Sequence, residues 1–114
     1  MIEKKYQYST AEITRLLMEK IVDDENVNIN HICVPPGEAV PTHVSNSHVH
    51  QIIVRGCLSL SLEDGEFANY QAGDVFAIPF NQKMVIQNRG SEPLEFFVVK
   101  APNPRSMPAV KAIN

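Results

Sequence analysis

Turn-forming residues interrupt this chain of 114 residues at short, regular intervals. Glycine, proline, asparagine or aspartate recurs about every ten residues between short apolar segments, a pattern typical of all-β sandwiches and barrels. The clearest strand covers residues 57–62, where leucines alternate with a cysteine and two serines, the period of a half-buried strand. Asp64 and Gly65 follow it and are predicted to form a two-residue hairpin loop. The pattern therefore predicts an all-β fold.

The length and composition restrict that fold further. A chain of 114 residues can bury one core but not two, so we expect a single domain. The hydrophobic share of 44% and the charged share of 20% are those of a folded globular protein. A net charge of −3 provides no basic surface for nucleic acid. No spanning apolar segment and no signal peptide are recognised, so we expect a cytoplasmic protein without a membrane partner.

Two groups of three residues share one spacing, with five residues between the first member and the second. The groups are Gly37, His43 and Gly56, and Gly73, Pro79 and Asn88. Together these positions resemble the two motifs of the cupin superfamily, in particular the small single-domain members with the conserved barrel of cupin type 2. The resemblance covers about residues 30–100. It implies a small jelly-roll β-barrel, also described as a double-stranded β-helix.

Two extensions are expected around a barrel core of residues 30–100. Residues 1–29 are predicted to form a short N-terminal extension packed on the barrel, with a strand and a short helix. Residues 101–114 are a proline-rich tail, predicted to be an extended arm that is ordered only where it packs on the barrel or on a second subunit.

The segment 9–22 fits two structures. Ser9 and Glu12 have the spacing of a helix capping box, and the apolar residues that follow fit one helical face. Residues 17–22 also fit a strand. We favour a short helical turn near residues 10–13 followed by a strand, because an all-β barrel needs that strand.

In the usual cupin pattern, the two motifs also carry three histidines and a glutamate that bind a metal. His43 is the one such residue at the matching positions, and the other three positions hold Ser45, Val49 and Met84. Serine and valine cannot replace a histidine and a carboxylate, and a methionine thioether is a weak, soft ligand. We therefore expect the standard metal site to be absent and these four residues to line an apolar cavity with a few polar groups.

A nearby pair of histidines leaves a second interpretation open. His48 and His50 are two residues apart and share one face of a strand, opposite to the face expected for His43. A bulge at residues 45–47 would turn both inward and complete a three-histidine site for a divalent transition metal. A regular strand is the favoured interpretation, so no cofactor is firmly predicted.

Three further residues are interpreted as structural. Cys33 and Cys57 are predicted to be buried thiols rather than a disulfide, because a reducing cytoplasm disfavours that bond. His31 lies in the strand expected near residues 28–34 and is predicted to be hydrogen-bonded or at the surface.

Two hypotheses for the function follow. The first is a barrel that binds a small organic molecule in its cavity, with no specific reaction assignable. The alternative is a metal-dependent cupin enzyme with a rearranged histidine site, of the dioxygenase, isomerase or decarboxylase type that the resemblance implies. Whether the protein is an enzyme stays open at this point. A homodimer is expected in either case, because small cupins commonly pair through their sheets and two-fold dimers are the commonest oligomers.

Overall fold

The computed structural model describes residues 1–113, and this part of the chain contains nine strands and one short 3₁₀ helix. The strands are β1 (Leu17–Asp23), β2 (Asn28–Val34), β3 (Ala39–Val44), β4 (Val49–Arg55), β5 (Cys57–Leu62), β6 (Ala68–Gln71), β7 (Val75–Ile78), β8 (Lys83–Gln87) and β9 (Leu94–Lys100). The helix η1 covers Pro104–Ser106. The predicted all-β class is confirmed.

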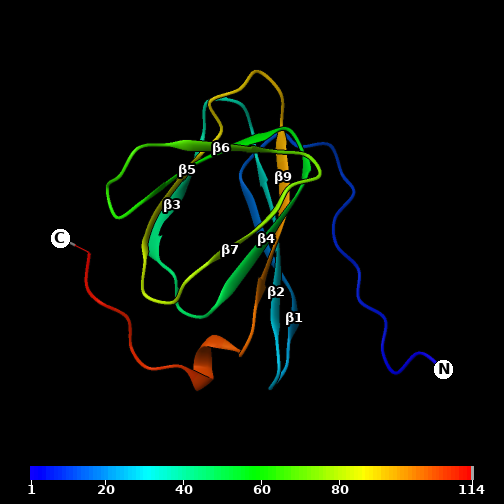
Figure 1. Cartoon of the computed structure of the whole chain (residues 1–114). Coiled ribbons are helices and arrows are strands. Elements are labelled where there is room, and N and C mark those ends of the chain that lie inside the picture. The colour runs from blue at the N-terminus through cyan, green and yellow to red at the C-terminus, as the bar shows by residue number, and fades with distance from the viewer. Residues whose placement is uncertain (114) are drawn as a thin grey trace.

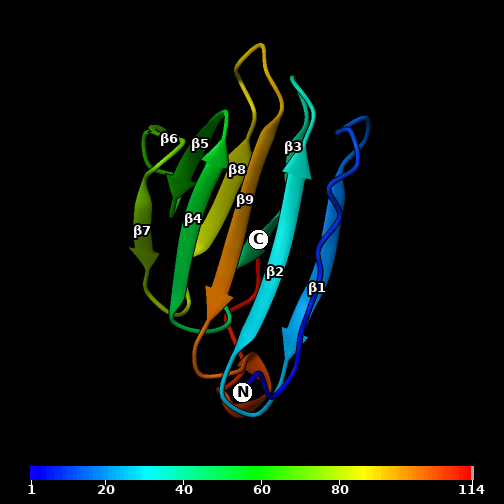
Figure 2. The same cartoon turned by 90° about the vertical axis from the view of Figure 1, so that its right-hand side faces the viewer.

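The strands form two antiparallel sheets that face each other (Figures 1 and 2). The five-stranded sheet has the order β1-β2-β9-β4-β7, and the four-stranded sheet has the order β3-β8-β5-β6. The chain crosses repeatedly between the two sheets, so strands adjacent in a sheet are mostly distant in sequence. This is the predicted jelly-roll barrel, a double-stranded β-helix.

The core lies between the inner faces of the two sheets. In β9, Leu94, Phe96 and Val98 are buried in it, and the residues between them point to the outer face. Phe96 is fully buried, as is Leu58 of the opposite sheet. Because burial of such a side chain contributes about 1.5–3 kcal/mol, the alternating pattern of the strands is the main source of stability.

The N-terminal region differs from its predicted helical turn. Residues 10–13 are not helical, and the strand predicted after them is present as β1. The Ser9 side chain accepts a hydrogen bond from the N–H of Ala11, two residues away, rather than capping a helix. Its own N–H donates to the Glu19 carboxylate of β1 at 2.8 Å, so this contact with the sheet replaces the capping box. β1 itself is an edge strand of the five-stranded sheet.

The hairpin turn after β5 also differs from its prediction. Glu63 and Asp64 have positive φ angles of 52° and 59°, so they form the two-residue loop in place of Asp64 and Gly65. The N–H of Gly65 donates to the carbonyl oxygen of Leu62 and closes the turn. The carboxylate of Glu63 accepts from the N–H of Lys83 in β8, at 2.8 Å. The turn is thus hydrogen-bonded to a strand distant in sequence.

The C-terminal tail packs against the barrel over its described residues. The Asn103 side chain is buried and donates to the Asp23 carboxylate and to the carbonyl oxygen of Asp24. Further along, the N–H of Lys111 donates to the Asn81 side chain at 2.9 Å. The described residues contain no helix that is long and apolar enough to cross a membrane.

Candidate functional site

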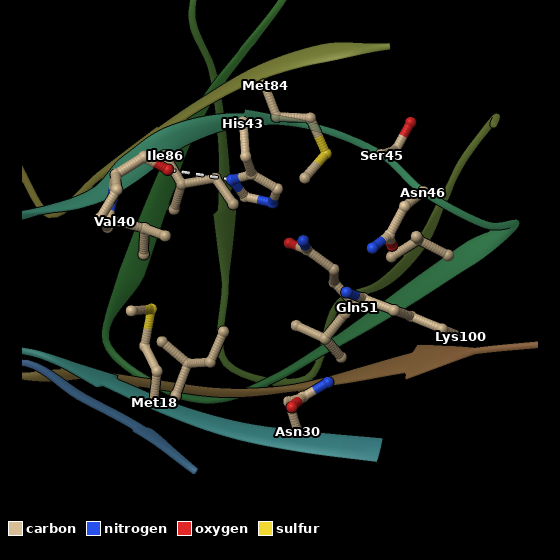
Figure 3. Close-up of a pocket in the computed structure, with 14 residues that line it drawn as sticks. Met18, Asn30, Val40, His43, Ser45, Asn46, Gln51, Met84, Ile86 and Lys100 are labelled. Atoms are coloured by element: carbon tan, nitrogen blue, oxygen red, sulfur yellow. Dashed lines mark hydrogen bonds between the residues drawn. The ribbon is translucent and has the colours of Figure 1, made fainter. Parts of the chain in front are cut away.

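A cavity of about 280 Å³ lies between the two sheets (Figure 3). Its wall includes the apolar side chains of Met18, Ile32, Val40, Val49, Met84 and Ile86. Its polar side chains are those of Asn30, His43, Ser45, Asn46, Gln51 and Lys100. All four residues expected at the cupin metal positions are therefore on this wall.

β3 and β8 place His43 beside Met84, since the two residues are opposite each other in the register of these strands. The His43 ring donates from Nδ1 to the carbonyl oxygen of Pro41 at 3.0 Å. In the neutral imidazole, this bond selects the tautomer in which Nε2 carries no hydrogen and can accept a hydrogen bond. Figure 3 shows the ring between Met84 and the polar groups of the cavity. His43 thus offers one imidazole acceptor to a molecule in the cavity.

The Ser45 hydroxyl is already used by the fold. It donates to the carbonyl oxygen of Pro79 at 2.6 Å and accepts from the N–H of Gln82 at 2.8 Å. In Figure 3 it points away from the centre of the cavity. Ser45 therefore joins the end of β3 to the segment before β8. It forms part of the cavity wall, but its hydroxyl is not available to a bound molecule or metal.

The residues at the usual metal positions do not fit a resident metal ion. His43 has one free ring nitrogen, Ser45 has a committed hydroxyl, and Val49 has no ligand atom. Met84 adds only a thioether, which is a poor ligand for zinc, iron or manganese. Stable binding of these metals needs three or four strong ligands that converge. The cavity chemistry is therefore that of hydrogen bonding, charge and apolar contact.

The structure does not bring His48 and His50 into the cavity. Both side chains are exposed, while Val49 and Gln51 between and beyond them are buried. The bulge required for the three-histidine site is not at residues 45–47. The register irregularity of β3 lies earlier, between Val40 and His43. The structure therefore does not bring His48 and His50 together with His43, because the burial of β4 alternates from Val49 to Ile53.

Besides Asn30, three polar residues of the cavity were not predicted as site residues. Gln51 is 1% exposed, and its carbonyl oxygen has no hydrogen-bond partner in the described protein. The side-chain oxygen of Asn46 is also buried without a hydrogen-bond partner in the described protein. The third is Lys100, which is opposite Val49 in the register of β4 and β9. The sequence could have predicted Gln51, because it is two residues from Val49 and therefore on the same face of the strand. It could not have predicted Lys100, whose place on the wall depends on the pairing of β4 with the distant strand β9.

Burial affects the charge of Lys100. The surrounding protein removes much of the water that would solvate the ammonium group, and this lowers its pKa below the ordinary value of 10.5. The positive charge of Lys20 lowers that pKa further. Lys100 thus brings an ammonium group to a cavity whose other polar side chains are His43, Ser45 and three amides.

A second polar cluster lies on the outer face of the five-stranded sheet, beneath the N-terminal segment. It consists of His31, Cys33 and Glu95, whose ligand atoms all lie within 4.8 Å of one another. His31 is fully buried, and its Nε2 is 2.6 Å from the carboxylate of Glu95. The ring of Tyr8 covers His31, with ring centroids 4.8 Å apart. Among the described residues, this is the group whose histidine, thiol and carboxylate could share a metal ion.

The surroundings of the thiol in this outer cluster disfavour its charged form. Burial, together with the carboxylates of Glu95 and Glu19, raises the pKa of Cys33 to about 11. A thiolate is needed for attack or for metal ligation, so a neutral thiol behaves as a small apolar group. Cys33 is buried as predicted, whereas Cys57 is only partly buried, and both are free thiols.

The comparisons with known proteins agree with this fold and these motifs. Residues 30–100 match the family model described as Cupin domain, and the chain belongs to the cupin family. It is 51% identical over 109 residues to the uncharacterized protein MJ0764 of Methanocaldococcus jannaschii, covering 96% of this chain and 93% of that protein. The crystal structure of the rmlC-like cupin MJ0764 matches with a TM-score of 0.87 and 52% identity, covering 93% of this chain and 96% of that one.

A more distant structure shares the fold alone. It is an uncharacterized conserved protein with a double-stranded β-helix domain from Klebsiella pneumoniae, with a TM-score of 0.74 and 20% identity. The match covers 84% of this chain and 80% of that one. The architecture is therefore retained where most of the sequence has changed.

Proposed function

We propose that this protein binds a small organic molecule in the cavity between its sheets and that its standard metal site is largely lost, with no specific reaction assignable. One observation carries the proposal. The apolar cavity of about 280 Å³ is lined by residues whose buried side-chain oxygens have no hydrogen-bond partner in the described protein. Small-molecule sites are typically apolar concavities with a few polar groups that orient the ligand.

The unpartnered oxygens of Gln51 and Asn46 support this proposal. A buried polar atom without a hydrogen bond costs about 1–3 kcal/mol. Hydrogen-bond donors on a bound molecule would remove that cost, because both residues line the cavity. The small volume limits the ligand to about the size of a simple organic acid, alcohol or amide.

The alternative of a metal-dependent enzyme has less support. It requires His48 and His50 beside His43, and both side chains are exposed on the other face of β4. A divalent transition metal in the cavity would have His43 as its only strong ligand among the described residues. Binding without metal chemistry is therefore the favoured function.

The proposed binding is tested by thermal-shift screening of small organic molecules, followed by calorimetry of each hit. Val49→Phe fills part of the cavity and is expected to abolish binding of the hits. Val110→Phe, on the exposed tail, is the matched control and is expected to bind normally. Val98→Leu is a milder wall substitution for use if Val49→Phe does not fold. Unchanged affinity in the folded cavity variants would contradict the proposal.

We also propose that the protein is a cytoplasmic homodimer. Support for the dimer comes from Val54 and Val75, which are 45% and 61% exposed on neighbouring strands β4 and β7. Burial of such an apolar patch against a second copy would be favourable. Sedimentation equilibrium of the wild type and of Val75→Lys tests this: a dimer that becomes monomeric is expected, and a monomeric wild type would contradict it.

A further inference from the structure

Lys100 occupies an unusual position for a lysine. It continues the inward-facing series of β9 that includes Phe96 and Val98, so its side chain enters the space between the sheets. Figure 3 shows Lys100, Asn46 and Gln51 on one side of the cavity and Met18 and Val40 on the other. The cavity therefore has a cationic, amide-lined end and an apolar end.

The ammonium group of Lys100 has no acidic partner in the described residues, where it takes part in no ion pair and no side-chain hydrogen bond. Asp23 is the acid that lines the neighbouring surface, and its carboxylate is already engaged. It accepts from Asn103 at 2.6 Å and pairs with Lys20 and Arg105 at 3.4 Å and 3.2 Å. A partly buried charge without a counterion is unfavourable, so an anion at this position would be stabilised.

A second pocket adjoins the cationic end of the cavity. The two pockets share Asn30, Asn46 and Lys100 in their walls. The second also contains Lys20 and Arg105, so its wall carries three basic side chains against the single carboxylate of Asp23. An electropositive approach to one end of an apolar cavity favours the entry of anions.

We propose that the cavity takes a small organic monocarboxylate whose carboxylate pairs with Lys100 and whose apolar body lies against Met18, Val40 and Met84. This inference rests on the proposed binding function. One negative charge matches the single unpaired ammonium group of the cavity wall. The side-chain amides of Asn30 and Asn46 can donate to the same carboxylate. Because an ion pair in a partly dry site is stronger than in water, charge becomes the main selector among ligands of similar shape.

The test uses two matched pairs of probes, hexanoate with hexanamide and benzoate with benzamide, measured by calorimetry at pH 7. In the wild type each acid is expected to bind about tenfold more tightly than its amide, or better. Lys100→Met, which keeps most of the length of the side chain and removes its charge, is expected to weaken acid binding by about tenfold or more and to change amide binding by less than about twofold. Lys5→Met on the exposed N-terminal segment is the control and is expected to change neither.

The outcomes separate this inference from the proposed function. If the amides bind as tightly as the acids, or if Lys100→Met leaves acid binding unchanged, the carboxylate assignment is overturned while small-molecule binding stands. If neither the acids nor the amides bind, this inference is overturned, and the wider thermal-shift screen decides the proposed function. The comparison of acid with amide in the wild type decides the matter even where Lys100→Met does not fold.

Discussion

At the scale of the residue, Asn88 shows why a motif position needs one particular side chain. It is 1% exposed and donates from Nδ2 to the carbonyl oxygens of Val34 and Glu92, at 2.9 Å and 2.8 Å. Its side-chain oxygen accepts from the N–H of Gly90 at 3.0 Å. One amide thus joins the end of β2 to the loop between β8 and β9.

Asn88→Ala is expected to lower the free energy of unfolding by about 2–4 kcal/mol, because it leaves buried backbone groups without partners. Urea denaturation measures this change. Asn26→Ala, at an exposed position, is the control and is expected to cost less than about 0.5 kcal/mol. Equal effects of the two substitutions would show that the buried network contributes no stability.

Lys100 yields a prediction of pH dependence. Its pKa in the folded protein lies below 10.5, so folding weakens proton binding and the charged side chain disfavours the folded state at pH 7. Lys100→Met removes this cost and is expected to raise the melting temperature at pH 7. The gain should shrink as the pH rises towards 10.5, because the lysine then loses its proton in both states. A gain of constant size across pH 7–10.5 would contradict this explanation.

At the scale of the element, the junction of β4 and β5 depends on Gly56. Its φ angle is +80°, and a Cβ atom at this position would lie 2.3 Å from the carbonyl oxygen of Pro93. Gly37 has a similar φ of +81°, but a Cβ atom there would meet nothing within 4 Å. The two motif glycines therefore share a backbone conformation and differ in their surroundings.

This difference predicts unequal effects of one substitution. Gly37→Ala is expected to cost about 1–2 kcal/mol of folding free energy, the strain of an alanine at positive φ. Gly56→Ala adds a backbone clash and is expected to cost at least about 2 kcal/mol more. Denaturant unfolding of both variants tests the order, and a smaller effect at Gly56 would be inconsistent with close approach of Pro93.

The N-terminal strap, defined as residues 1–16, protects the outer face of the five-stranded sheet. Figure 2 shows this segment running beside β1. Tyr8 contacts both His31 and Phe97, with ring centroids 4.8 Å and 4.9 Å apart. The strap therefore covers the outer cluster that contains Cys33.

Tyr8→Ala in a Cys57→Ala background is expected to accelerate modification of Cys33 by a thiol reagent by about tenfold, because local opening exposes the thiol. The matched control is Tyr6→Ala, since Tyr6 is exposed and contacts Lys4 rather than the cluster. Reaction is followed at pH 8 under native conditions. Equal rates for Tyr8→Ala and the unsubstituted strap would mean that other residues protect Cys33.

At the scale of the whole molecule, the exposure of His48 and His50 makes the alternative three-histidine metal site testable. The double substitution His48→Ala/His50→Ala is expected to leave the melting temperature unchanged, since both side chains are exposed. It is also expected to leave the content of iron, manganese, nickel and zinc unchanged in elemental analysis after incubation with each ion. Loss of a stoichiometric metal in this variant would restore the three-histidine interpretation.

Much of the architecture was predictable because it depends on local patterns. The alternation in residues 57–62 gave a strand there, and the spacing of the motif glycines, proline and asparagine identified the cupin barrel. That spacing also pointed to His43, Ser45, Val49 and Met84, which the structure places on the cavity wall. Their part in binding is still a proposal.

The sequence by itself determined the all-β class and the cupin family, since each depends on residue type and spacing along the chain. Only the tertiary structure decided that residues 10–13 are not helical, that Glu63 and Asp64 form the turn, and that Lys100 enters the cavity. Each of these outcomes depends on contacts between residues distant in sequence. Local periodicity carries no information about such contacts, because they form only when the two sheets close around their common core.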